Sequence, residues 1–193
     1  MAATLWSAWR PKDVTVWFLE AFPVLLALPI LGATRRRFPL SRLAYVAVAF
    51  HAAVLLVGAK STYAETPVGF WLRDLFGFER NPWDRVGHVA QGAFPAILAR
   101  EVLLRTTPLR RGGWLFFLVT SVCLAIAAGY ELLEWAVAVY GPGEEGIAFL
   151  ATQGDPWDTQ WDMFLALCGA VAAQLLLARL HDREIARATG ASA

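Results

Sequence analysis

The chain has 193 residues, of which 58% are hydrophobic and only 17% are charged. Soluble domains carry about 25% charged residues, so this composition excludes an ordinary soluble protein. The formal net charge of +1 and the lack of a basic stripe argue against nucleic acid as a partner. Cys123 and Cys168 lie inside apolar blocks and form neither a spaced metal motif nor a disulfide framework.

Apolar blocks recur along the chain, each about the 20 residues that a helix needs to cross a hydrocarbon core of about 30 Å. They predict an all-α fold, a polytopic transmembrane helix bundle of about five spans that forms a single integral membrane domain over residues 1–193. The spans are expected at about 14–32, 40–58, 85–104, 113–140 and 159–180. Arg10, Pro11 and Lys12 precede the first block and no cleavage site follows it closely, which favours a mature span over a signal peptide.

The stretch 66–78 is too short to span the membrane. It carries Arg73 and Asp74 in an aromatic, amphipathic setting, which predicts an interfacial or re-entrant helix.

Lys and Arg are divided unevenly between the two sides of this predicted topology. Eleven of them fall on one side, including Arg35, Arg36 and Arg37, and six fall on the other. Because cytoplasmic loops carry the excess of basic residues, we expect the N-terminus outside and the C-terminus in the cytoplasm.

Polar and ionisable residues inside the spans gather near one side of the membrane. At a rise of about 1.5 Å per residue, all of them lie within roughly 14 Å of the outer boundary. They are Glu20, His51, His88, Gln91, Glu131, Glu134 and Asp162. Alternate spans run in opposite directions, so no single offset in sequence produces this agreement. Ionisable groups in a membrane are costly and mark functional sites, so the pattern predicts a shared polar site.

Local spacing places several of these side chains on common helix faces. Asp84 and His88 are four residues apart, and Glu131 and Glu134 are three apart. Converging carboxylates in a low dielectric need a proton, a metal or an arginine between them, and Arg85 is the nearest arginine.

The predicted site is a divalent metal centre. Its expected ligands are His88, Glu131, Glu134 and Asp162. Histidine with carboxylates suits Zn, Mn or Fe, and an oxygen-only subset suits Mg or Ca.

The predicted catalytic residues surround this centre. They are Asp84, which would orient His88, Asp155 or Asp158 as a base, and Arg85. The secondary candidates are Glu20, His51, Glu65 and Gln91.

Each of these assignments has a structural alternative. The cluster can be a buried hydrogen-bond network that joins helices. His51 can bond a backbone carbonyl, Glu20 can snorkel to the interface, and Asp84 can cap the third span. Glu101 and Arg105 are expected to form a salt bridge at the inner end.

Several motifs point to a known family. They are Tyr63-Ala-Glu65, Asn81-x-x-Asp84-Arg85-x-Gly87-His88, Gln91-Gly92, Ala99-Arg100-Glu101, Tyr130-Glu131-x-x-Glu134-Trp135 and the long run from Thr152 to Met163. From roughly residue 40 to 180 the chain resembles the YjdF-like bacterial inner-membrane proteins, whose shared domain has no assigned function. The resemblance implies an inner-membrane location and a helical fold, and it implies no reaction. Position 83 departs from the family pattern, since Trp83 stands where Tyr is usual.

The leading functional hypothesis is a metal-dependent hydrolase or transferase that acts on a lipid or lipid-linked head group at the outer leaflet. The chain lacks a GxSxG elbow, which argues against the serine hydrolase route. Its three His residues are too few for a His-rich diiron site. The alternatives are a proton- or metal-coupled transporter and a non-catalytic membrane assembly or sensor protein. The lipid bilayer is the expected partner in every case, and an oligomer is compatible with each.

Overall fold

The computed structural model describes residues 1–141 and 149–190, and every regular element in these ranges is a helix. The α-helices are α1 (Ala2–Ala8), α2 (Val14–Thr34), α3 (Arg42–Ser61), α4 (Pro67–Phe76), α5 (Trp83–Thr106), α6 (Gly113–Tyr140) and α8 (Asp158–Thr189), and a short 3-10 helix, η1, covers Tyr63–Glu65. The prediction of an all-α helical bundle is confirmed.

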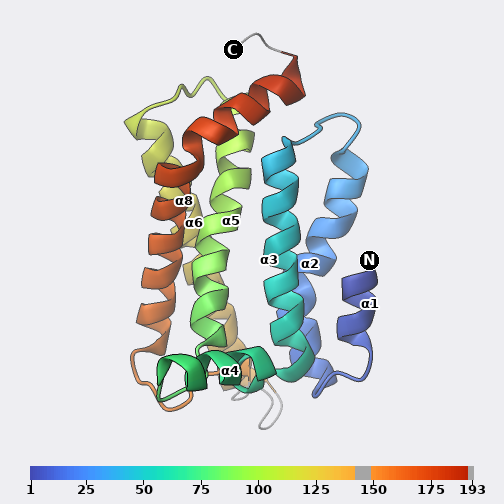
Figure 1. Cartoon of the computed structure of the whole chain (residues 1–193), viewed down its shortest axis with the longest axis vertical. Coiled ribbons are helices and arrows are strands. Elements are labelled where there is room, and N and C mark those ends of the chain that lie inside the picture. The colour runs from blue at the N-terminus through green and yellow to red at the C-terminus, as the bar shows by residue number, and fades with distance from the viewer. Residues whose placement is uncertain (142–148, 191–193) are drawn as a thin grey trace.

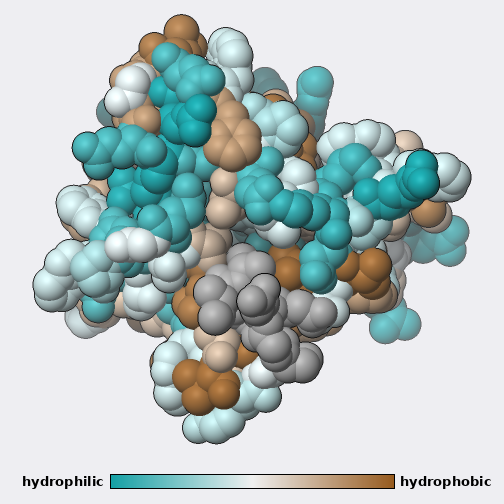
Figure 2. Space-filling model, turned by 90° about the horizontal axis from the view of Figure 1, so that it is seen from below, coloured by the Kyte–Doolittle hydropathy of each residue, from teal (hydrophilic) through white to brown (hydrophobic). Residues whose placement is uncertain are grey.

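The five long helices lie side by side and alternate in direction, and α4 lies across one end of the bundle (Figure 1). We call this end the α4 end, and we call the opposite end, where the chain finishes, the C-terminal end. Hydrophilic side chains gather across the α4 end, interrupted by hydrophobic ones (Figure 2). Helix α4 coincides with the segment predicted to be an interfacial or re-entrant helix, and the choice between these two stays a prediction.

Four of the five predicted spans coincide with helices that are long and apolar enough to cross a membrane: α2, α3, α6 and α8. Helix α5, the third predicted span, is not among them, and its role as a fifth span stays a prediction. It has 24 residues, a length of about 36 Å at 1.5 Å per residue. It packs against α3, α6 and α8, which buries its polar residues Asp84, His88, Gln91, Arg100 and Glu101 against protein.

Helix α5 packs most closely against α8, and glycines make this approach possible. A Cβ atom added at Gly92 of α5 would overlap the backbone oxygen of Ala166 in α8. A Cβ atom added at Gly169 of α8 would overlap the backbone oxygen of Val89 in α5. The two backbones therefore touch, as small residues allow in membrane helix pairs.

A buried ionic cluster joins three helices at the C-terminal end. The Glu101 carboxylate accepts hydrogen bonds from the Ser41 backbone N–H at 2.8 Å and from Nη1 of Arg105 at 2.7 Å. Nε2 of His181 lies 3.1 Å from its second oxygen, and both Glu101 and His181 are 0% exposed. The predicted pair of Glu101 and Arg105 is present, and α8 extends beyond residue 180 to bring His181 against it.

Apolar side chains fill the bundle between this cluster and the α4 end. Ala47, Ile97, Val119, Cys123 and Ala170 are among the buried residues of this core. The core separates Glu101 from the polar residues of the α4 end.

Replacing Gly92 by valine should lower the stability of the protein by about 1–3 kcal/mol or more, because the new side chain must push α8 away. Thermal unfolding of the purified protein in detergent measures the change. The matched control is Gly129→Val, since a Cβ atom at Gly129 meets nothing within 4 Å. Equal melting temperatures for the two variants would contradict the close packing of α5 and α8.

Replacing Glu101 by alanine should cost about 3–5 kcal/mol of stability, because it leaves the buried His181 and the largely buried Arg105 without their carboxylate. Unfolding by SDS titration measures this loss. Asp74→Ala is the control, since Asp74 pairs with Arg73 in solvent, and exposed pairs contribute at most about 1 kcal/mol. A Glu101→Ala variant as stable as Asp74→Ala would show that the cluster contributes little.

Candidate functional site

His88 lies at the centre of a buried polar cluster that three helices build at the α4 end. Its Nε2 atom lies 3.5 Å from Oδ1 of Asp84 in α5, 3.6 Å from Oε1 of Glu131 in α6, and 3.9 Å from Oδ2 of Asp162 in α8. None of these four residues is more than 5% exposed. Residues far apart in the sequence thus converge at one point, in agreement with the similar membrane depths predicted for them from the sequence.

Glu134 belongs to the same cluster, one helical turn after Glu131. One ligand atom from each of His88, Glu131 and Glu134 lies within 4.8 Å of the others, and the same holds for Asp84, His88 and Asp162. The four predicted metal ligands and Asp84 therefore form two overlapping sets that share His88.

The ring of His88 lies between Gln91 and Asp84. Nδ1 of His88 lies 3.1 Å from Oε1 of Gln91. An amide oxygen can only accept, so Nδ1 donates in this contact, and Nε2 faces the carboxylates. Asp84 stands on the Nε2 side at 3.5 Å, where it is also a candidate ligand, and its predicted role in orienting His88 stays a prediction. Asp84 does not cap α5, because the N-cap position is Pro82.

Two carboxylate oxygens in this cluster are buried and have no hydrogen-bond partner in the described part of the chain. They are Oε1 of Glu131 and Oδ1 of Asp162. A buried polar atom left without a partner costs about 1–3 kcal/mol, and more when it is charged. A cation is a partner that carboxylate oxygens of this kind can take, and His88 belongs to both candidate ligand sets, so the residues present fit a divalent metal.

A cavity of about 80 Å³ adjoins the cluster on the side of α2 and α3. Its polar lining includes Glu20, His51, Tyr63, Tyr130 and Glu134. One water occupies about 30 Å³, so the cavity has room for roughly two waters. Glu20 is 4% exposed and does not snorkel, and Nε2 of His51 has no hydrogen-bond partner among the residues that the structure describes. Both secondary candidates therefore face the site.

Tyr63 contributes a neutral donor to this cavity from outside the long helices. Burial and the nearby carboxylates of Glu20, Asp84 and Glu134 raise the pKa of Tyr63 well above its ordinary value. Its hydroxyl therefore stays protonated.

The arginine that serves the cluster is Arg80 and not the predicted Arg85. Nη1 of Arg80 donates to Oδ1 of Asp158 at 2.5 Å, and Nη2 lies 3.6 Å from Oδ2 of Asp84. Arg85 instead pairs with Asp155 at 2.9 Å on a different face of α5. The spacing of four residues between Arg80 and Asp84 is the sequence signal that could have identified Arg80.

The remaining candidate, Glu65, lies away from the cluster. It forms an ion pair with Lys12, and its side chain is 54% exposed. It shares the α4 end with the cluster but none of its contacts.

Asn81 and Gln153 have a positioning role that the sequence did not reveal. The Gln153 side chain accepts from the Asn81 backbone N–H and donates to the Asn81 carbonyl, each at 3.0 Å. The Asn81 side chain donates to the carbonyl of Thr66 at 3.0 Å. These bonds join the start of α5 to the segment before α8, which brings Asp84 and Asp158 to the same arginine.

Comparison with known proteins agrees with this architecture. Residues 1–183 match a family described as predicted membrane protein (DUF2238). Over 175 residues the chain is 46% identical to the inner membrane protein YjdF of Escherichia coli strain K12. The matched region covers 91% of this chain and 83% of that protein. No solved structure matches the chain. The resemblance drawn from the motifs is confirmed, as is an integral, multi-pass location in the inner membrane, and the chain belongs to the DUF2238 family of predicted membrane proteins.

Proposed function

We propose that the protein is a metal-dependent hydrolase or transferase that acts on a lipid or lipid-linked head group at the outer side of the inner membrane. The observation that carries the proposal is the buried cluster around His88, with its two carboxylate oxygens that lack partners. The ligands we assign are His88, Glu131, Glu134 and Asp162, with Asp84 as a fifth candidate.

The donor set supports a divalent cation. One imidazole nitrogen with carboxylate oxygens suits Zn, Mn or Fe, and the oxygens alone suit Mg or Ca. A cation there supplies Lewis acidity toward a phosphate or ester oxygen and activates water. The contact of Gln91 with Nδ1 of His88 is the outer-shell support that metal-binding histidines usually have.

Residues beside the cluster supply the other functions that the reaction needs. Arg80 contacts Asp84 and Asp158, so its charge lies where an anionic head group would meet the cluster. Asp158 and Asp155 are the candidate bases. Asp155 is the more accessible of the two, with a side chain that is 22% exposed.

The proposed orientation follows from the basic residues. The C-terminal end carries the larger share of Lys and Arg, which favours the cytoplasm for that end and the outer side for the α4 end. The cluster then lies at the depth of the outer head groups.

An enzyme fits these observations better than a carrier does. A carrier needs ionisable groups or a repeat that reaches across the membrane. The apolar core around Ile97 and Val119 instead separates the His88 cluster from Glu101.

The purified protein should contain about one divalent metal per chain by elemental analysis, and Glu134→Gln should contain at least tenfold less, since losing a charge-assisted ligand contact costs about 1.5–3 kcal/mol. Glu65→Gln is the matched control, because Glu65 lies at the same end and outside the cluster. Metal-free wild type with an unchanged melting temperature in chelator would refute the metal site.

A strain that lacks the protein should accumulate one lipid or lipid-linked species with an unprocessed head group, measurable by mass spectrometry of total lipids. Wild type and Glu65→Gln should restore the profile, and Asp162→Asn should not. If Asp162→Asn restores the profile fully, or if deletion leaves the lipids unchanged while Asp162→Asn only lowers protein yield, the cluster is a structural hydrogen-bond network.

A further inference from the structure

A second and much larger cavity lies on another face of α5. Its volume is about 1140 Å³, above the roughly 300–1,000 Å³ of typical small-ligand sites. Val54 of α3, Leu72 of α4, Val89 of α5 and Leu165 of α8 line it, so four helices form a groove. On α5, the residues that line the groove differ from those around the small cavity, where Asp84, Gly87, His88 and Gln91 lie.

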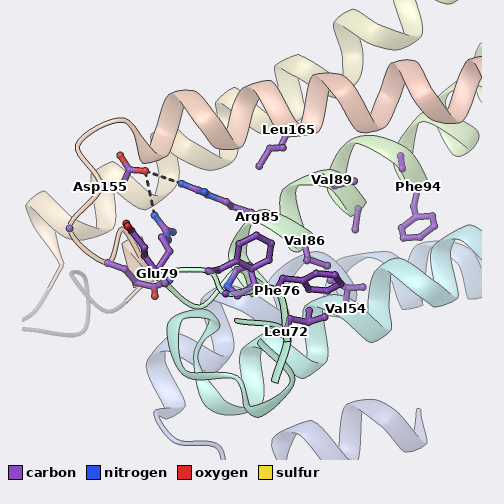
Figure 3. A pocket seen from close by; sticks show the side chains of 18 residues that line it. Val54, Leu72, Phe76, Glu79, Arg85, Val86, Val89, Phe94, Asp155 and Leu165 are labelled. Atoms are coloured by element: carbon purple, nitrogen blue, oxygen red, sulfur yellow. Dashed lines mark hydrogen bonds and ion pairs between the residues drawn. The ribbon is translucent and has the colours of Figure 1, made fainter. Parts of the chain in front are cut away.

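The groove has a charged end and an apolar end. Figure 3 shows Asp155, Arg85 and Glu79 at one end and Phe94 at the other, with Val86 and Val89 between them. Phe94 follows Arg85 by nine positions along α5, a rise of about 14 Å. This length is close to the depth of one leaflet of a hydrocarbon core about 30 Å thick. The length and polarity of the groove therefore complement a lipid whose head group lies at the interface and whose acyl chain points into the membrane.

Two arginine side chains reach the charged end of the groove. Arg85 is the more accessible, with 37% of its side chain exposed, against 14% for Arg80. Guanidinium donors bind phosphate oxygens in strong charge-assisted hydrogen bonds. The exposed part of Arg85 can therefore take an acceptor such as a phosphodiester.

The charges that line the groove are balanced. Arg80 and Arg85 are matched by Glu79 and Asp155. Asp155 is already engaged by Arg85 at 2.9 Å, whereas Glu79 is exposed at the groove. A head group with phosphate alone would pair with the arginines and leave the carboxylate of Glu79 without a cation. A zwitterionic head group places its phosphate beside the arginines and its ammonium beside Glu79, so it neutralises both the positive and the negative side chains of the groove.

We infer that the groove binds a phospholipid with a primary amine head group, of the phosphatidylethanolamine class. Its phosphate accepts hydrogen bonds from Arg85 beside the positive charge of Arg80, its ammonium donates to Glu79, and an acyl chain lies along Val89 and Phe94. The primary ammonium offers three donors and a choline group offers none, which favours the amine over choline. This site is separate from the metal cluster and goes beyond the proposed function.

The test uses full-length protein in detergent, with native mass spectrometry of lipids that share dioleoyl chains. Phosphatidylethanolamine should be retained about tenfold more strongly than phosphatidylglycerol or phosphatidylcholine, the ratio expected from one charge-assisted hydrogen bond. Glu79→Gln should abolish this preference, and Arg85→Gln should weaken binding of all three lipids.

Variants that fill the groove test its location. Val89→Trp and Leu72→Trp, on α5 and α4, should each lose the retained lipid. Leu176→Trp is the matched control, because Leu176 is 78% exposed and does not line the groove. Because the two blocking positions lie on different helices, the test can still be read if one of the variants fails to fold.

The outcomes are distinct. Equal retention of the three lipids by wild type, or stronger retention of phosphatidylglycerol, overturns the head-group assignment. Retention by both folded blocking variants at the level of Leu176→Trp shows bulk lipid contact only and overturns the site. Glu134→Gln should leave lipid retention unchanged, so a failure of this inference is distinguishable from a failure of the metal proposal.

Discussion

A charged side chain in hydrocarbon is costly, and α5 carries four nearly buried ionisable residues: Asp84, His88, Arg100 and Glu101. The helix can hold them only because α3, α6 and α8 pack around it. Gly92 and Gly169 let α8 approach closely enough to bring Asp162 to His88 at one end and His181 to Glu101 at the other. The packing of α5 against α8 is thus the constraint on which both polar clusters depend.

The two clusters have different characters, although each combines a histidine with acidic groups. Ser41, Arg105 and His181 contact the two carboxylate oxygens of Glu101, so we assign this cluster the structural role of joining helices. The cluster around His88 has several carboxylates, little hydrogen bonding and an adjoining cavity. Buried groups without partners cost stability, which a protein tolerates where binding or chemistry requires them.

Arg80 connects the His88 cluster with the groove on the other face of α5. It contacts Asp84 and Asp158, and it lines the charged end of the groove. The bonds between Asn81 and Gln153 hold this arginine in place by joining the start of α5 to the segment before α8. A lipid head group beside Arg80 would therefore be linked to the proposed metal site through the ion pair of Arg80 with Asp84.

The sequence by itself determined that the chain is a membrane helix bundle and that His88, Glu131, Glu134 and Asp162 lie near the same end of it. Both properties follow from the length of apolar blocks and the alternating direction of helices, which are countable along the chain. Only the tertiary structure decided that Gln91 contacts Nδ1 of His88, that Arg80 rather than Arg85 contacts Asp84, that Glu65 lies apart and that His181 contacts Glu101. These contacts depend on how each helix is rotated about its axis and how closely its neighbours approach, and side-chain packing rather than hydropathy sets both.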